Sequence, residues 1–179
     1  MQNFKQIDGD LASVVYDRIK GLSRALEGKS STPVRLAVDV CFQTAVAASR
    51  FRANFYDLSL KLVGSGLDGQ HQLPLDAMAL FTQSLGELRH ENQLAIHQEM
   101  AVSLRPFDTA KLQYRICVMH SGCIRLLEVF YQLDTFVMGV TAKRDAREIS
   151  GEHASALITR VDALLDAMKI GFLTQRSRF

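Results

Sequence analysis

The stretch Lys111–Val140, KLQYRICVMHSGCIRLLEVFYQLDTFVMGV, decides the fold because its hydrophobic period changes partway along. Its first part alternates with a period of two, which is typical of a half-buried strand. The apolar face consists of Leu112, Tyr114, Ile116 and Val118, and the polar face consists of Gln113, Arg115, Cys117 and Met119. Ser121 can cap a helix, since its hydroxyl oxygen can accept a bond from a backbone N–H. From Cys123 to Val140 apolar residues recur every three or four positions, which predicts a buried helix.

A second strand–helix unit with the same plan lies upstream, in Pro33–Val63, PVRLAVDVCFQTAVAASRFRANFYDLSLKLV. Its strand alternates Val34, Leu36, Val38 and Val40 with Arg35, Ala37, Asp39 and Cys41. A helix is expected to begin at Gln43 or Thr44 and to reach Leu62. The two units share a pattern and few identical residues. Because a lone strand leaves backbone groups unpaired, we expect the two strands to pair, either within one chain or across a dimer.

The rest of the chain reads as helix and connector. We predict an N-terminal helix and linker in 1–32, a long helix in 74–104 and a C-terminal helix in 150–170. Between them, Gly64–Leu73 has the glycines of a flexible connector and Lys143–Ser150 has the polarity of a loop. With the strand–helix units in 33–63 and 111–140, the expected fold is one domain over 1–179, mainly α with two short β-strands.

The composition is that of a soluble globular protein. The chain has 179 residues, of which 47% are hydrophobic and 22% charged, and its net charge is only +2, so no strong basic field indicates nucleic acid. No apolar run approaches the roughly 20 residues of a membrane span, and the start of the chain lacks a signal-peptide layout. We therefore expect a cytoplasmic protein with no membrane association. Its three cysteines, Cys41, Cys117 and Cys123, occur in apolar stretches of the sequence and are expected to be reduced core or strand residues.

Candidate enzyme motifs are weak. His90 and His97 lie seven residues apart, which is not a recognised metal-ligand spacing, so a solvated helix face is the better interpretation. Cys123 lies close to His120, but it begins an apolar stripe and no third group is evident to orient a nucleophile. Gly64-Ser65-Gly66 lacks the later glycine and lysine of a phosphate-binding loop. We expect no enzyme, no cofactor and no metal.

Asp134 falls in the middle of the apolar helix of the second unit. A buried carboxylate needs a partner, so we expect a structural ion pair with Arg125, Arg50 or Arg52. A catalytic role for Asp134 is the less favoured alternative.

The polar faces of the two strands offer a more specific hypothesis. Gln113 and Arg115 share one face in the second unit, as Arg35 and Asp39 do in the first. If these faces point outward, the paired strands form a ribbon that fits the major groove of DNA, where Arg reads guanine and Gln reads adenine. The alternative is an ordinary solvated face, since any half-buried strand has a polar side.

The same units carry a resemblance to a known family, the AcaB-like proteins of integrating conjugative elements and conjugative plasmids. VRLAVDVCFQTAVAASRF resembles the family's N-terminal block, and SLRPFDTAKLQYRICVMHSG resembles its block of a proline followed by a strand. IRLLEVFYQLDTFVMGVTAKRDAREISGEHASALI is similar to its helix with a central aspartate, here Asp134, and the turn into the last helix. The resemblance covers roughly Val34 to Met168. It implies a ribbon-helix-helix-like core elaborated with extra helices, a homodimer, and a DNA-binding regulator that controls transfer of the element.

Together these features predict a DNA-binding transcriptional regulator that reads double-stranded DNA with a β-ribbon. Arg35, Gln113 and Arg115 are the predicted base contacts, and the predicted phosphate contacts are Lys111, Lys143, Arg144 and Arg147. Two alternatives remain open. One is a helical adaptor that binds a protein partner and no DNA, and the other is a small-ligand sensor with a pocket near Tyr56, Tyr114 or Tyr131.

Overall fold

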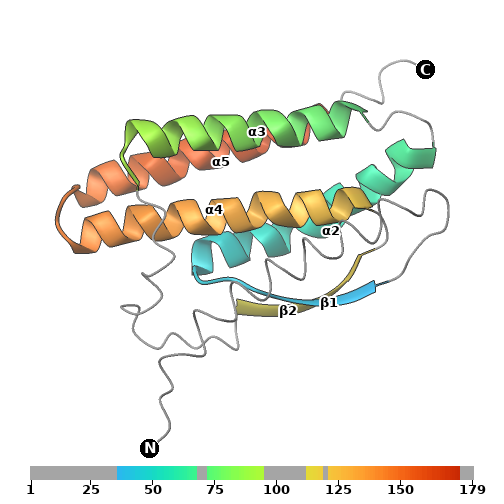
Figure 1. The fold of residues 1–179 in the computed structure, drawn as a ribbon, viewed down its shortest axis with the longest axis horizontal. Helices are drawn as coiled ribbons and strands as arrows, with labels where there is room; N and C mark the ends of the chain where they lie inside the picture. Colours follow the sequence, from blue (N-terminus) through green and yellow to red (C-terminus); the bar gives the residue numbers. More distant parts are fainter. Residues whose placement is uncertain (1–35, 68–71, 95–111, 119–120, 174–179) are drawn as a thin grey trace, which may run out of the picture.

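The computed structural model describes residues 36–67, 72–94, 112–118 and 121–173. Its elements are β1 (Leu36–Cys41), α2 (Ala45–Leu67), α3 (Gln72–Glu91), β2 (Gln113–Val118), α4 (Ser121–Asp145) and α5 (Gly151–Leu173), shown in Figure 1. The prediction of a mainly α fold with two short strands is confirmed. The helix predicted in 1–32 lies outside the described residues.

The two strands pair with each other inside one chain, which answers the question that the sequence left open. They form an antiparallel ribbon whose register runs from Leu36 opposite Val118 to Cys41 opposite Gln113. The period-two pattern is borne out in their burial. Val40, Ile116 and Val118 are buried, whereas Asp39, Gln113 and Arg115 are exposed.

The elements form three layers (Figure 1). The ribbon lies on one side, α2 and α4 form the middle layer, and α3 and α5 form the layer farthest from the ribbon. Along the chain the order strand–helix–helix occurs twice, as β1-α2-α3 and β2-α4-α5. The corresponding elements of the two halves contact each other: β1 pairs with β2, α2 packs on α4, and α3 packs on α5.

One hydrophobic core joins the layers. Aromatic side chains gather where the ribbon meets the middle layer. The largest fully buried side chains of the core include Phe42, Phe51, Phe55, Phe130, Phe136, Leu58, Leu62, Leu127 and Leu133. Phe51 contacts four other rings, with centroid separations of 4.8 Å to Phe42, 4.7 Å to Phe55, and 5.4 Å to both Tyr114 and Phe130. These rings fix the inner face of the ribbon to the helices, since aromatic side chains bury large areas.

Two predicted connectors are partly helical in the described residues. Helix α2 continues to Leu67 through Gly64 and Gly66, where a flexible connector was predicted, and α4 continues to Asp145, into the predicted polar loop. Local propensity is a weak guide here because packing of a helix against its neighbours outweighs the cost of a glycine.

Helix α3 is shorter than predicted, since it ends at Glu91 instead of continuing to 104. Gln93 adopts a left-handed φ of 49°, and Leu94 N–H donates to the carbonyl of Arg89. Leu94 itself is buried. This is a Schellman end in which Gln93 stands at the position that glycine usually occupies.

Helix α5 begins where it was expected. The hydroxyl of Ser150 accepts a bond from His153 N–H at 3.1 Å, which makes Ser150 the N-cap. Among the described helices, none combines the length and hydropathy that a bilayer-crossing segment requires.

Candidate nucleic-acid interface

The outer face of the ribbon is open to solvent. Ala37, Asp39, Gln113, Arg115 and Cys117 are all exposed on it. The DNA hypothesis requires the polar strand faces to point outward, and the face that carries Arg115 does so. The first strand's predicted base contact, Arg35, lies outside the described residues, as does the predicted phosphate contact Lys111.

At the centre of this face, Asp39 and Arg115 lie directly opposite each other in the register. Arg115 Nε donates to Asp39 Oδ1 at 3.0 Å and Nη2 donates to Oδ2 at 3.4 Å. The side chains remain 76% and 73% exposed, for Arg115 and Asp39 respectively. An ion pair so exposed contributes about 0.5 kcal/mol or less, so either partner can exchange it for another polar group at little cost.

The inner face explains how the ribbon is held rigid. Tyr114 packs between Phe42 and Phe51, and its hydroxyl donates to the carbonyl of Ala48 at 3.5 Å. Tyr131 stacks on the other side of Phe42, at a ring separation of 5.3 Å. The candidate interface therefore rests on packed rings and not on a loop.

Asp134 has a role that sequence reasoning missed. Its carboxylate accepts bonds from the backbone N–H of Gln43 at 2.7 Å and of Thr44 at 2.9 Å, and from the Thr44 hydroxyl at 2.7 Å. Thr44 Oγ1 in turn accepts a bond from Ala47 N–H at 3.2 Å, so the pair caps the start of α2. Asp134 thus ties α4 to the loop that joins the ribbon to α2.

The predicted ion pair of Asp134 with an arginine is wrong. Arg52 and Arg125 are exposed, and Arg50 pairs instead with Asp162 of α5. Burial raises the pKa of Asp134 to about 6, although the bonds from Gln43 and Thr44 act in the opposite direction. Backbone donors satisfy a carboxylate as well as a guanidinium does, and they leave no trace in the residue types.

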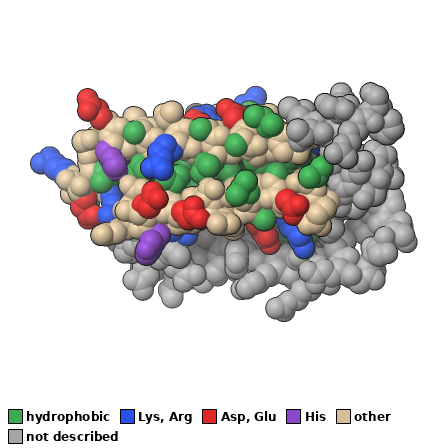
Figure 2. All heavy atoms as spheres, turned by 90° about the horizontal axis from the view of Figure 1, so that it is seen from above, with side chains coloured by type: hydrophobic (Ala, Val, Ile, Leu, Met, Phe, Trp, Pro, Cys, Tyr) green, Lys and Arg blue, Asp and Glu red, His purple; other side chains and the backbone are tan. Residues whose placement is uncertain are grey.

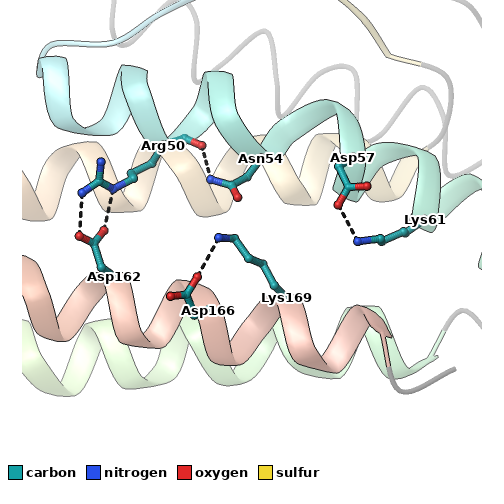
Figure 3. A network of polar contacts seen from close by, with 7 residues as sticks. All are labelled: Arg50, Asn54, Asp57, Lys61, Asp162, Asp166 and Lys169. Carbon is teal, nitrogen blue, oxygen red and sulfur yellow. Dashed lines mark hydrogen bonds and ion pairs between the residues drawn. The ribbon is translucent and has the colours of Figure 1, made fainter. Parts of the chain in front are cut away.

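Arg50 and Asp162 belong to a polar network between α2 and α5, shown in Figure 3. Arg50 Nε and Nη2 each donate to Asp162 at 2.7 Å. The bond to Asp162 raises the pKa of Arg50 above its usual value, against the opposing effect of burial. Each partner's side chain is only 35% exposed, which makes this a contact that fixes the helices and not an open site.

The described residues among the predicted phosphate contacts do not share a surface with the outer face of the ribbon. Lys143, Arg144 and Arg147 lie where α4 turns into α5, and Lys143 Nζ donates to the carbonyl of Asn92, just past the end of α3, at 3.1 Å. Lys143 also pairs with Glu148 at 3.6 Å, and Arg144 pairs with Asp145 at 2.8 Å. Arg147 has a left-handed φ of 60° and forms the turn that ends α4. Their role as phosphate contacts stays a prediction.

The three cysteines differ in their exposure to solvent. Cys123 is 1% exposed and Cys41 is partly buried, as expected for reduced residues in apolar surroundings. Cys117 is a strand residue of β2 and is exposed on the outer face of the ribbon. Its position follows from the strand alternation, which places it on the polar side with Gln113 and Arg115.

The described part of the chain holds no cluster of three or more His, Cys, Asp or Glu side chains that would suit a metal ion. His90 is exposed at the end of α3, and both His97 and His120 lie outside the described residues. Of the tyrosines proposed to line a ligand pocket, Tyr56 is 56% exposed and Tyr114 and Tyr131 are packed against other rings.

Comparisons with known proteins do not identify a family. No family model matches the chain, and neither the curated proteins nor the solved structures contain a significant match.

Proposed function

We propose that this protein binds double-stranded DNA with the outer face of the β1–β2 ribbon. The observation that carries the proposal is an exposed, two-stranded antiparallel ribbon with Arg115 and Gln113 on its open side and packed helices behind it. A ribbon of this width enters the major groove, where base edges present a pattern that distinguishes all four base pairs.

The central pair suggests which bases are read. Arg115 suits the O6 and N7 acceptors of guanine, and Asp39 suits the amino group of the paired cytosine. Since the two side chains lie opposite each other on neighbouring strands, one G·C pair can occupy both when their mutual ion pair opens. Gln113, two residues before Arg115 on the same face, suits an adjacent adenine.

Two further parts of the proposal rest on the resemblance to the AcaB-like family. They are the role in transcriptional regulation of a conjugative element and the formation of a homodimer. The cytoplasmic location that we expect is the compartment in which such a regulator meets DNA.

The test is selection of bound duplexes from a random pool, followed by fluorescence anisotropy with one short selected site at several salt concentrations. We expect binding that weakens steeply with salt, because neutralised phosphates release counterions. Arg115→Ala should lose about 10- to 100-fold in affinity at the selected site and should relax the preference at one G·C pair. Lys169→Ala is the control for loss of a basic side chain, since Lys169 belongs to α5, in the layer farthest from the ribbon.

Asp39→Ala gives a second, opposite signature. It should tighten binding to unrelated DNA, because it removes a negative charge from a surface that meets phosphates, while reducing the preference for cytosine at the central pair. Failure to bind any duplex at low salt, or equal losses for Arg115→Ala and Lys169→Ala, would refute the ribbon as a reader of DNA.

The alternative is an adaptor that binds a protein partner and no DNA. It is favoured by one observation: Arg115, Lys143 and Arg144 all pair with carboxylates of the same chain, which compensates the charge of these three described basic residues. Absence of DNA binding in the titration above would select this function.

A further inference from the structure

The outer face of α3 and α5 carries an apolar stripe on the side of the molecule away from the ribbon. Figure 2 shows a row of hydrophobic side chains along this face with charged groups beside it. We define the stripe as Leu73 and Leu80 of α3 with Ala163 and Ala167 of α5, all of which are exposed. Leu80 is 63% and Leu73 is 50% exposed, an arrangement that is costly in water and typical of a covered surface.

The two helices of this face run antiparallel and close together. Near one end, a Cβ atom added at Gly171 would lie 2.6 Å from the Cβ of Ala77, so only glycine permits this approach. Near the other end, Arg160 Nη2 lies 3.7 Å from Glu91 Oε2. The second end is therefore charged, with Glu87, Glu91 and Arg160, whereas Leu73 and Leu80 lie toward the first.

We propose that a second copy of this chain covers the apolar stripe, with its two-fold axis parallel to α3 and α5. This axis places α3 of one copy over α5 of the other with like ends together. Glu87 and Glu91 of each copy then face Arg160 of its partner. A two-fold axis across the helices would instead place α3 over α3 and set Glu87 and Glu91 against the apolar Leu73 of the other copy, where neither carboxylate gains a basic partner from that copy.

Shape and size agree with the same pairing. In this pairing Leu80 of one copy meets Ala163 and Ala167 of the other. Ile170 of α5, which is 60% exposed on the same helix face as Ala163, adds apolar area toward the end that holds Leu73. Two helices of about 20 residues make a face about 30 Å long and about 20 Å wide, or about 600 Å² per copy. The total of about 1,200 Å² reaches the lower end of stable specific interfaces.

The pairing has a consequence that rests on the proposed DNA binding. Because the ribbon and the α3–α5 layer lie on opposite sides of α2 and α4, the dimer directs its two ribbons away from each other. Such a dimer binds two separate duplexes and does not span adjacent half-sites on one duplex.

Sedimentation velocity of the full chain without DNA tests the interface independently of the proposed function. We expect a dimer, and Leu80→Glu should raise its dissociation constant at least about 100-fold by burying an unpaired carboxylate. Leu60→Glu is the matched control, since Leu60 is 62% exposed on α2, and it should leave the dimer unchanged. Circular dichroism checks that both variants fold. A wild-type monomer, or a dimer weakened by Leu60→Glu and not by Leu80→Glu, overturns the proposal.

Charge reversal tests the direction of the axis. On its own, the Arg160→Glu variant should be monomeric, and so should the Glu87→Lys/Glu91→Lys variant. In a homodimer of either variant, both of the symmetry-related contacts would set like charges against each other. Mixing the two variants should restore association, since every contact then joins opposite charges. Persistence of either homodimer, or no association in the mixture, excludes this axis.

A duplex-bridging assay then separates the two proposals. Wild type should co-capture a second, labelled duplex on beads that carry the first, and Leu80→Glu should bind the first duplex but not the second. Dimerisation without any DNA capture leaves the interface standing and refutes the DNA proposal. DNA binding by a protein that stays monomeric refutes the interface and leaves the DNA proposal standing.

Discussion

The protein contains two arginine–aspartate pairs that are alike in chemistry and differ in place. Arg50 binds Asp162 through two contacts of 2.7 Å between helices α2 and α5, and both side chains are 35% exposed. Arg115 binds Asp39 across the ribbon at 3.0 and 3.4 Å, with both side chains about three-quarters exposed. The first pair is short and partly shielded from water, so it fixes two helices. The second is loose and hydrated, so it is available for exchange with a ligand.

Asp134 extends this comparison to an aspartate that has no arginine at all. Its pKa is raised to about 6 from an ordinary value of 3.8, chiefly by burial, which corresponds to about 3 kcal/mol at 1.36 kcal/mol per pKa unit. The folded state holds the proton of Asp134 more tightly than the unfolded state does, so the protonated carboxyl raises the free energy of unfolding. This contribution is complete below about pH 4 and is lost as the pH rises through about 6. The largest expected effect is therefore a fall in the free energy of unfolding across this range.

Urea unfolding at a series of pH values measures this fall, and Asp134→Asn should remove most of it. The neutral amide keeps an acceptor for the Thr44 N–H but cannot titrate. Asp162→Asn is the control for a general effect of removing a carboxylate. Parallel pH curves for wild type and Asp134→Asn would contradict the assignment.

Breaking the helix pair is expected to have the next largest effect. In a double-mutant cycle with Arg50→Ala and Asp162→Ala, we expect a coupling energy of about 1 kcal/mol, because bidentate geometry and partial burial strengthen the interaction relative to a surface pair. Chemical denaturation of the four proteins gives this value. The Lys61–Asp57 pair within α2, whose aspartate is 66% exposed, is a reference that should couple by less than half as much. A coupling no larger than this reference would show that the helix pair is only a surface contact.

The contrast between the pairs also shows what the sequence can predict. Strand alternation placed Asp39 and Arg115 on open faces correctly, because one register of a period-two pattern buries the valines and isoleucine. The start of the last helix was also predicted to within one residue, because its apolar period begins directly after the polar loop that ends at Ser150. Residues that act on their own strand or helix turn were therefore predictable.

Contacts that join distant parts of the chain could not be predicted from the sequence. Nothing in the residue types links Arg50 to Asp162, because the choice between several carboxylates depends on how α5 lies against α2. Asp134 was recognised as a buried carboxylate in need of a partner, but its partners include the backbone N–H groups of Gln43 and Thr44. Every residue except proline offers such a donor, so no pattern points to these two.

The ribbon pair is expected to show the smallest effect on stability. A double-mutant cycle with Asp39→Ala and Arg115→Ala should give a coupling energy of about 0.2–0.5 kcal/mol, which high salt should reduce further because the charges are hydrated and screened. The same substitutions should alter DNA affinity about 10-fold or more under the proposed function. A small coupling energy in unfolding together with a large change in DNA affinity would indicate that the pair serves ligand binding and not stability. A coupling energy above about 1 kcal/mol would instead mean that Asp39 and Arg115 serve to hold the two strands together, and that the open face of the ribbon is structural.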